Sequence, residues 1–149
     1  MPFFTLQLDP AGGGPILQAV VSVSAPRAAA LQQANEAIPQ FQVIRALVDT
    51  GASHTCIDPS VLSALGLTPS GSTDCFTPTT GATPVPKDTY DVGFNIIAQV
   101  GIPHLGIETL SVMESSLSIQ GIHALIGRDV LAHCHLTYDG RAKLFTLAF

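Results

Sequence analysis

Two short apolar runs, each followed directly by a glycine turn, constrain the fold of this chain more than any other feature. Residues 46–48 (Ala-Leu-Val) run into residues 49–51 (Asp-Thr-Gly), and residues 124–126 (Ala-Leu-Ile) run into residues 127–129 (Gly-Arg-Asp). Short continuous apolar runs between turn residues are typical of buried strands. Two such units in one chain predict an approximate two-fold repeat within one β-rich subunit.

Most of the remaining sequence also favours short strands separated by turn residues. We expect strands at residues 3–8, 16–24, 41–48, 54–57, 88–100, 107–113, 122–126, 135–138 and 142–148. The first two could form a hairpin, and Asp139 with Gly140 is the turn signal of a closing hairpin. Many short strands with turns between them predict a mostly β fold: a closed small barrel with one or two short helices.

Two segments carry helix signals. Residues 26–35 have the best helix propensity of the chain, with Pro at the first position, and we expect residues 24–40 to form a surface insert. Asp58 has the features of an N-cap for a short helix at residues 59–65, and Gly66 has those of its C-terminal stop.

The composition bears on partners and location. A length of 149 residues favours a single domain over residues 1–149. Charged residues make up only 11% of the chain, against about 25% in an average domain. A surface so poor in charge predicts that a partner covers part of it, and a homodimer is the simplest partner. The net charge of −5 argues against nucleic acid. We see no signal peptide and no apolar run of bilayer length, so we expect a cytoplasmic protein that does not associate with membranes.

Asp49 is the candidate catalytic residue. Gly51 permits a tight turn, so the Asp49 carboxylate is held at the end of a buried strand, where a lone charge would be costly. Two such carboxylates facing each other can share one proton. The ionised member can then accept a proton from a water, while the protonated member donates to a peptide carbonyl. The chain has no second Asp-Thr-Gly. Asp129 lies near the second glycine turn, but it follows the glycine, whereas Asp49 precedes Gly51, so the two positions do not match. The second carboxylate should therefore be Asp49 of another subunit.

An ordinary turn would explain residues 49–51 taken alone, because Asp and Gly are common turn residues. The wider pattern favours an active site, because the sequence resembles the retropepsin family, the dimeric aspartic proteases of retroviruses and their cellular and bacterial relatives. Residues 49–52 match its catalytic loop, and residues 125–128 match its second signature, in the right order. Residues 77–86 fall where the family has a β-hairpin flap. The likeness is greatest to free-standing bacterial members.

The resemblance implies the acid-protease (retropepsin) fold, with one lobe per subunit, and a homodimeric aspartic endopeptidase that acts on peptides or proteins without a cofactor. Asp49, Thr50 and Gly51 would be catalytic, with Thr50 bonding across the two-fold axis. The residues that would bind substrate are Ala52, Ser53, Thr80, Gly81, Ala82 and Leu125.

The sequence also departs from the retroviral pattern. Ser53 and His54 stand where retroviral enzymes often carry acidic residues, so the expected partner of Arg128 is missing. Residues 2–6 and 145–149 resemble the terminal strands that interleave in the retroviral dimer.

The histidines and cysteines allow other interpretations. His133, Cys134 and His135 could bind zinc through two imidazoles on one strand face. No further pair stands at ligand spacing, so we favour structural or surface histidines and predict no metal site. Cys56, Cys75 and Cys134 are an odd, sparse set, which favours free thiols in a reducing compartment over a disulfide framework.

Two alternatives concern the function itself. The chain could be a non-proteolytic module of the same fold that dimerises and binds peptides. It could also be a precursor-like form, in which the flap or the insert at residues 24–40 blocks the cleft.

Overall fold

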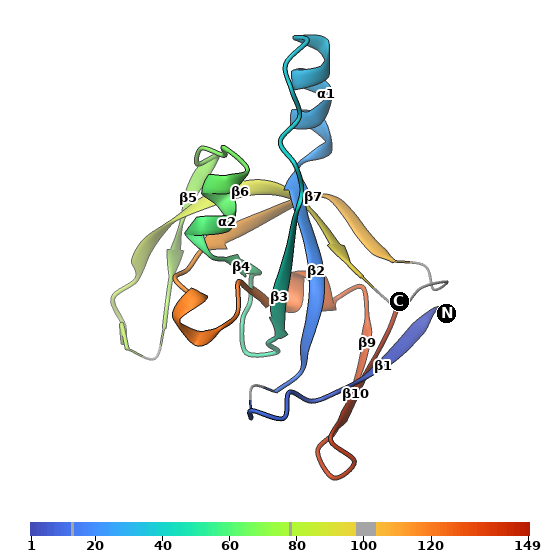
Figure 1. Cartoon of the computed structure of the whole chain (residues 1–149). Coiled ribbons are helices and arrows are strands. Elements are labelled where there is room, and N and C mark those ends of the chain that lie inside the picture. Colours follow the sequence, from blue (N-terminus) through green and yellow to red (C-terminus); the bar gives the residue numbers. More distant parts are fainter. Residues whose placement is uncertain (13, 78, 98–103) are drawn as a thin grey trace.

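The computed structural model describes residues 1–12, 14–77, 79–97 and 104–149 (Figure 1). The strands are β1 (Phe3–Gln7), β2 (Ile16–Val23), β3 (Gln42–Val48), β4 (Cys56–Ile57), β5 (Gly71–Cys75), β6 (Val85–Ile96), β7 (Leu105–Glu114), β8 (Ala124–Ile126), β9 (His135–Asp139) and β10 (Leu144–Ala148). The helices are α1 (Ala25–Gln33), α2 (Pro59–Ala64), α3 (Arg128–Leu131) and the 3₁₀ helix η1 (Ser118–Gln120).

Six strands close into a small barrel. They are hydrogen-bonded in the order β2-β3-β8-β4-β7-β6, and the ring closes because β2 also pairs with β6. β5 lies outside the ring and pairs with the first residues of β6. The barrel is filled by fully buried side chains that include Phe94, Ile96, Ile57, Ile126 and Val112. The prediction of a mostly β fold with a closed small barrel is therefore confirmed.

The two units recognised in the sequence lie side by side in this barrel. β3 and β8 run parallel, and Ala46, Leu47 and Val48 face Ala124, Leu125 and Ile126 in register. Both strands therefore end at the same level, and the two glycine turns follow next to each other.

The predicted hairpin between the first two strands is wrong. β1 pairs with β10, and β10 pairs with β9, in a separate three-stranded sheet. Both edges of β2 are taken, by β3 on one side and β6 on the other, so β1 finds its partner at the other end of the chain. Phe4 and Phe145 are buried beneath this pairing. In the single chain, the terminal strands therefore pair with each other.

The described residues contain three short α-helices and one 3₁₀ helix. α3 is a single turn that follows Gly127. α1 begins at Ala25, with Ser24 as its N-cap, and buries only Leu31. It projects from the top of the barrel in Figure 1, away from the loop that follows β3.

Strand boundaries differ from the predictions at the hairpin formed by β5 and β6. β5 was not predicted, because its sequence (Gly-Ser-Thr-Asp-Cys) has no apolar alternation. β6 begins at Val85 rather than at residue 88, and residues 98–100 of the expected strand lie outside the described residues. No helix in the described part of the chain is long and apolar enough to cross a membrane.

Asp58 caps α2, as predicted, and also binds a second segment. Its carboxylate is 3% exposed and accepts hydrogen bonds from the N–H and the hydroxyl of Ser60, at 3.0 and 2.6 Å. It also accepts from the N–H groups of Leu117 and Ser118, each at 2.8 Å. Burial raises the pKa of Asp58, but the hydrogen bonds from these three residues lower it more, so the net pKa lies well below the usual range. The charged carboxylate joins α2 to the start of η1.

Replacing Asp58 by Asn should lower the free energy of unfolding by about 2 kcal/mol at neutral pH, because charge-assisted hydrogen bonds to buried N–H groups are lost. The pKa of Asp58 is lower in the folded than in the unfolded chain, so its contribution is complete above the unfolded value of about 3.9 and declines as the pH falls below it. Urea unfolding at neutral pH and near pH 3 should therefore show a smaller difference from the parent in acid. Asp88→Asn, an exposed position, is the control, and an equal loss at both pH values would contradict this account.

Candidate active site

Asp49 follows the last residue of β3 and stands in a tight turn. Its N–H donates to the carbonyl of Ile126 in β8 at 3.0 Å. Its side-chain Oδ1 accepts from the N–H of Gly51 at 2.8 Å, and its carbonyl accepts from Ala52 at 3.2 Å. A Cβ on residue 51 would lie 3.1 Å from Asp49 Oδ1, which is a tight contact, so glycine at this position leaves space for the carboxylate. The side chain is half-buried, and Oδ2 accepts no hydrogen bond within the described residues.

Arg128, the first residue of α3, holds this loop. Nη1 donates to the carbonyls of Thr50 at 2.9 Å and Gly51 at 3.4 Å, and Nη2 donates to Ser53 Oγ at 2.9 Å. The backbone N–H of Arg128 donates to the carbonyl of Ala52 at 2.9 Å. Arg128 is therefore paired with the Asp49 loop. Its guanidinium binds backbone carbonyls of the loop and the Ser53 hydroxyl, which takes the place of an acidic side chain.

Arg128→Lys should lower kcat/KM for any reaction at Asp49 roughly 10²-fold, because the single nitrogen of an ammonium cannot reach the acceptors that Nη1 and Nη2 of the guanidinium reach separately, and the loop would lose its fixed position. The effect should fall on activity more than on stability, since Arg128 is exposed. Steady-state kinetics together with thermal unfolding would separate the two. A variant with parental kcat/KM would show that the guanidinium does not position the loop.

A second set of hydrogen bonds lies beneath the loop, and sequence reasoning missed it. Thr55 is fully buried, and its N–H and hydroxyl donate to the two carboxylate oxygens of Asp129, each at 2.8 Å. The N–H of Gly127 donates to Thr55 Oγ1 at 3.1 Å. The sequence offered two signals for this pair: a threonine directly before the apolar residues Cys56 and Ile57, and an aspartate directly after the Gly-Arg pair. Asp129 therefore supports the loop and does not serve as a second catalytic carboxylate within the chain.

Leu125 belongs to a small apolar wall that is separate from the barrel core. Its buried members are Cys56, Met113, Leu117 and Ile122, and Ile16, Leu47, Cys75 and Leu125 pack against them. Burial raises the pKa of the Cys56 thiol to about 11, and the nearby Cys75, Asp129 and Asp49 add to this shift. Cys56 therefore stays protonated at neutral pH, and it pairs with Leu125 of β8 on one side and Met113 of β7 on the other. The three cysteines are free thiols.

Thr80, Gly81 and Ala82 lie at the tip of the β5–β6 hairpin. The two strands pair from Gly71 and Thr89 up to Cys75 and Val85. Thr80 Oγ1 accepts from the N–H of Thr77 at 2.8 Å, and Gly81 has a φ of +60°, which favours glycine. A hairpin is therefore present where the resemblance implied a flap. Its tip and the loop after β3 point to the same side of the barrel in Figure 1, but no hydrogen bond joins them within the described residues.

His133 and His135 do not form a site with Cys134. Cys134 Sγ donates to the carbonyl of Val130 at 3.8 Å, and burial raises the pKa of its thiol. Both histidines are exposed. The described residues hold no group of three or more His, Cys, Asp or Glu side chains that could bind a metal ion.

Comparison with known proteins gives one family and one fold. The model of a protein family described as aspartyl protease matches residues 35–130 of the chain. No curated protein is similar to the chain at a significant level. Thirteen chains of solved structures match. One is a retropepsin-like aspartic protease from Rickettsia conorii, with a TM-score of 0.55 and 13% sequence identity, and the match covers 97% of this chain and 89% of that chain. At this identity the structural likeness establishes the retropepsin-like fold alone.

Proposed function

The chain belongs to the aspartyl protease family, and on that premise we propose that it is a homodimeric aspartic endopeptidase, in which one Asp49 from each subunit activates the attacking water. The observation that carries the proposal is the single Asp-Thr-Gly turn, held by Arg128 at the ends of two paired strands. One such loop supplies one carboxylate, and the chemistry needs two.

The mechanism assigns one part to each residue of the loop. The Asp49 carboxylates of the two subunits share one proton, because two neighbouring charges are unfavourable. The ionised one accepts a proton from the water as its oxygen bonds to the peptide carbon. The other donates its proton to the carbonyl oxygen, which gives a tetrahedral diol. The carboxyl that took the water proton then gives it to the leaving nitrogen, one hydroxyl of the diol returns a proton to the other carboxylate, and the C–N bond breaks to release the amine. Thr50, which is exposed in the single chain, would bond to the other loop across the axis, and Gly51 would lie against the substrate backbone.

The substrate would lie along the apolar wall. Leu125 would contact a side chain next to the cleaved bond, which favours apolar residues at that place. Ala52 and Ser53 would border the peptide backbone, with the Ser53 hydroxyl free to donate while its oxygen accepts from Arg128. Thr80, Gly81 and Ala82 would close over the peptide and exclude water.

The decisive experiment measures activity and molar mass together. An unfolded protein substrate is incubated with the enzyme over a range of acidic to neutral pH, with and without a peptidomimetic aspartic-protease inhibitor, while light scattering gives the mass. Below the dimer dissociation constant, the rate should rise with the square of the subunit concentration. Cleavage by a strict monomer would contradict the two-subunit mechanism. A dimer that binds peptides at every pH without cutting them would favour the binding-module alternative.

A further inference from the structure

Two of the three free thiols lie in one apolar cluster, and the mechanism proposed above uses neither. Cys56 is 8% exposed, and its Sγ donates to the carbonyl of His54 at 3.6 Å. Cys75, the last residue of β5, is partly buried and packs against the cluster that contains Cys56. Cys134 packs against the barrel core instead. The fold therefore brings together one thiol of the barrel and one thiol of the β5–β6 hairpin.

The charges that act on Cys56 agree with this placement. Burial is the largest cause that raises the pKa of Cys56, and Cys75 is the next largest. Asp129 and Asp49 raise this pKa further, while Lys87 of β6 lowers it. Coulombic effects weaken with distance, so the Cys56 thiol lies near the hairpin on one side and near the acidic groups of the candidate active site on the other.

The hairpin that carries Cys75 is paired with the barrel at one end only. β6 pairs with β7 from Thr89 onward, whereas residues 85–88 pair with β5 and, in the described part of the chain, with no other strand. Cys75 stands four residues beyond Gly71, roughly 13 Å along the strand. A two-stranded ribbon is only marginally stable by itself. The far part of the hairpin can therefore move, and Cys75 is the hydrophobic residue that packs it against the apolar wall.

We propose that Cys56 and Cys75 form a reversible disulfide under oxidising conditions, and that this bond ties the β5–β6 hairpin down over the apolar wall. With the hairpin tied, Thr80, Gly81 and Ala82 at its tip could not lift to admit a peptide, so the oxidised form is closed and the reduced form is open. The bond itself depends on the placement of the two thiols alone. Its consequence for cleavage rests on the proposed function.

A small disulfide such as oxidised glutathione is the oxidant. Cys75 is the more exposed thiol, so its thiolate attacks one sulfur of the oxidant, forms a mixed disulfide and releases one glutathione thiolate. Cys56 then loses its proton, and its sulfur attacks the Cys75 sulfur and displaces the second glutathione thiolate. The two glutathione thiolates take up the two protons that the cysteines lose. Two protein thiols are thus oxidised to one disulfide, and one glutathione disulfide is reduced to two thiols.

The geometry favours this pair over any that includes Cys134. A disulfide needs its two Cβ atoms about 3.8 Å apart. Side chains that pack in one cluster need only a small shift to reach that distance, and the hairpin can supply the shift because its far part pairs only with itself. Cys134 Sγ donates to the carbonyl of Val130 at 3.8 Å, on the side of the barrel core.

Peptide mapping tests the bond. The full chain is incubated with oxidised glutathione, the remaining thiols are alkylated in denaturant, and the protein is digested without reductant. We expect one cross-linked pair of peptides that joins Cys56 to Cys75 within one chain, and an alkylated Cys134. The Cys134→Ser variant should give the same cross-link. The Cys75→Ser variant, at a partly exposed position, should give none. Glutathione left on Cys75 with Cys56 alkylated, or a cross-link through Cys134, would overturn the inference.

Hydrogen exchange shows whether the bond restrains the hairpin. Backbone amides of residues 72–75 and 85–88 should exchange more slowly in the oxidised than in the reduced protein, and dithiothreitol should restore the faster exchange. The Cys75→Ser variant, treated in the same way, should show no change. Equal exchange of these amides in a cross-linked and a reduced protein would contradict the closed state.

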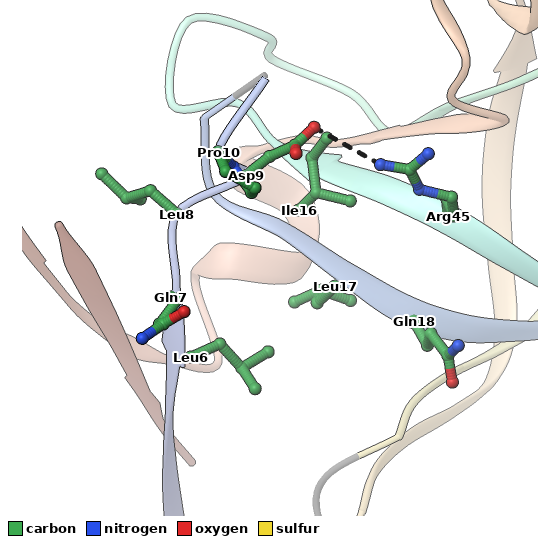
Figure 2. A pocket seen from close by; sticks show the side chains of 9 residues that line it. All are labelled: Leu6, Gln7, Leu8, Asp9, Pro10, Ile16, Leu17, Gln18 and Arg45. Carbon is green, nitrogen blue, oxygen red and sulfur yellow. Dashed lines mark hydrogen bonds and ion pairs between the residues drawn. The ribbon is translucent and has the colours of Figure 1, made fainter. Parts of the chain in front are cut away.

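The groove in Figure 2 is the internal reference for this measurement, because no cysteine lines it. It has a volume of about 330 Å³ and lies between β1 and β2. The ion pair between Arg45 Nη2 and Asp9 Oδ2, at 3.4 Å, lies across one end. Amides of residues 6–8 and 16–18 should exchange equally in both forms. A change there as large as in the hairpin would mean that oxidation alters the whole subunit, which would contradict a local tie.

Cleavage assays connect the bond to function. The oxidised parent should lose nearly all of the activity of the reduced parent and regain it in dithiothreitol. The ratio of oxidised to reduced activity should be close to one in Cys75→Ser and as low as the parental ratio in Cys134→Ser. If the reduced protein cleaves peptides through Asp49 and the cross-linked protein cleaves them equally fast, the inference fails and the proposed function stands. If the reduced protein cleaves nothing, the proposed function fails, and mapping and exchange still decide the disulfide.

Discussion

Replacing Asp49 by Asn should reduce kcat for peptide cleavage by about 10³-fold or more, while the fold and the dimer persist. Asn has nearly the shape of Asp, and its Oδ1 can still accept from the N–H of Gly51, which now lies at 2.8 Å from the carboxylate. It cannot hold the shared proton or accept one from water. Light scattering and circular dichroism should match the parent, and the cleavage assay should not. Asp91→Asn, an exposed position on β6, is the matched control.

Mixing the two proteins makes this test sharper. If each site uses one Asp49 from each subunit, an excess of Asp49→Asn subunits should capture parental subunits in mixed dimers and suppress their activity. The loss should follow the statistical fraction of mixed dimers once subunits exchange. Unchanged parental activity after full exchange would place the whole site within one chain and contradict the proposed mechanism.

Gly127→Ala should lower the free energy of unfolding by about 3 kcal/mol and abolish activity with it. A Cβ at this position would lie 2.5 Å from the carbonyl carbon and 2.7 Å from the carbonyl oxygen of His54, and 2.9 Å from the nitrogen of Thr55. These are backbone atoms, which cannot rotate away as a side chain does. Thr55, the residue before β4, and the start of α3 would have to separate, which breaks the hydrogen bonds between Thr55 and Asp129.

Urea unfolding and the cleavage assay measure the two effects. Gly71→Ala is the control, because its new Cβ would meet only the side-chain hydroxyl of Thr89, at 3.1 Å, which can move. It should cost less than about 1 kcal/mol. Equal stability of the two variants would show that the close approach at Gly127 can relax.

Much of the fold could be predicted because it depends on patterns within short stretches of the sequence. Apolar runs, turn residues and caps act over a few residues, and they placed the core strands, the cap at Asp58 and the closing hairpin of β9 and β10. The Asp49 loop and the Leu125–Ile126 run were found in the same way, as an apolar strand that stops at glycine. β5 could not be found, because its polar residues are held in place by pairing with β6 and not by any preference of their own.

Local patterns in the sequence are enough to predict a β-rich barrel with one acidic turn of the aspartyl protease type. The contacts between residues far apart in the chain are known from the folded molecule alone. They join Arg128 to Thr50 and Ser53, Asp129 to Thr55, and β1 to β10. Each of these contacts forms between strand edges or hydrogen-bond donors and acceptors that the closed barrel leaves unpaired. Several segments of the chain compete for such partners, so the pairing depends on the whole chain and cannot be predicted from a short stretch of sequence.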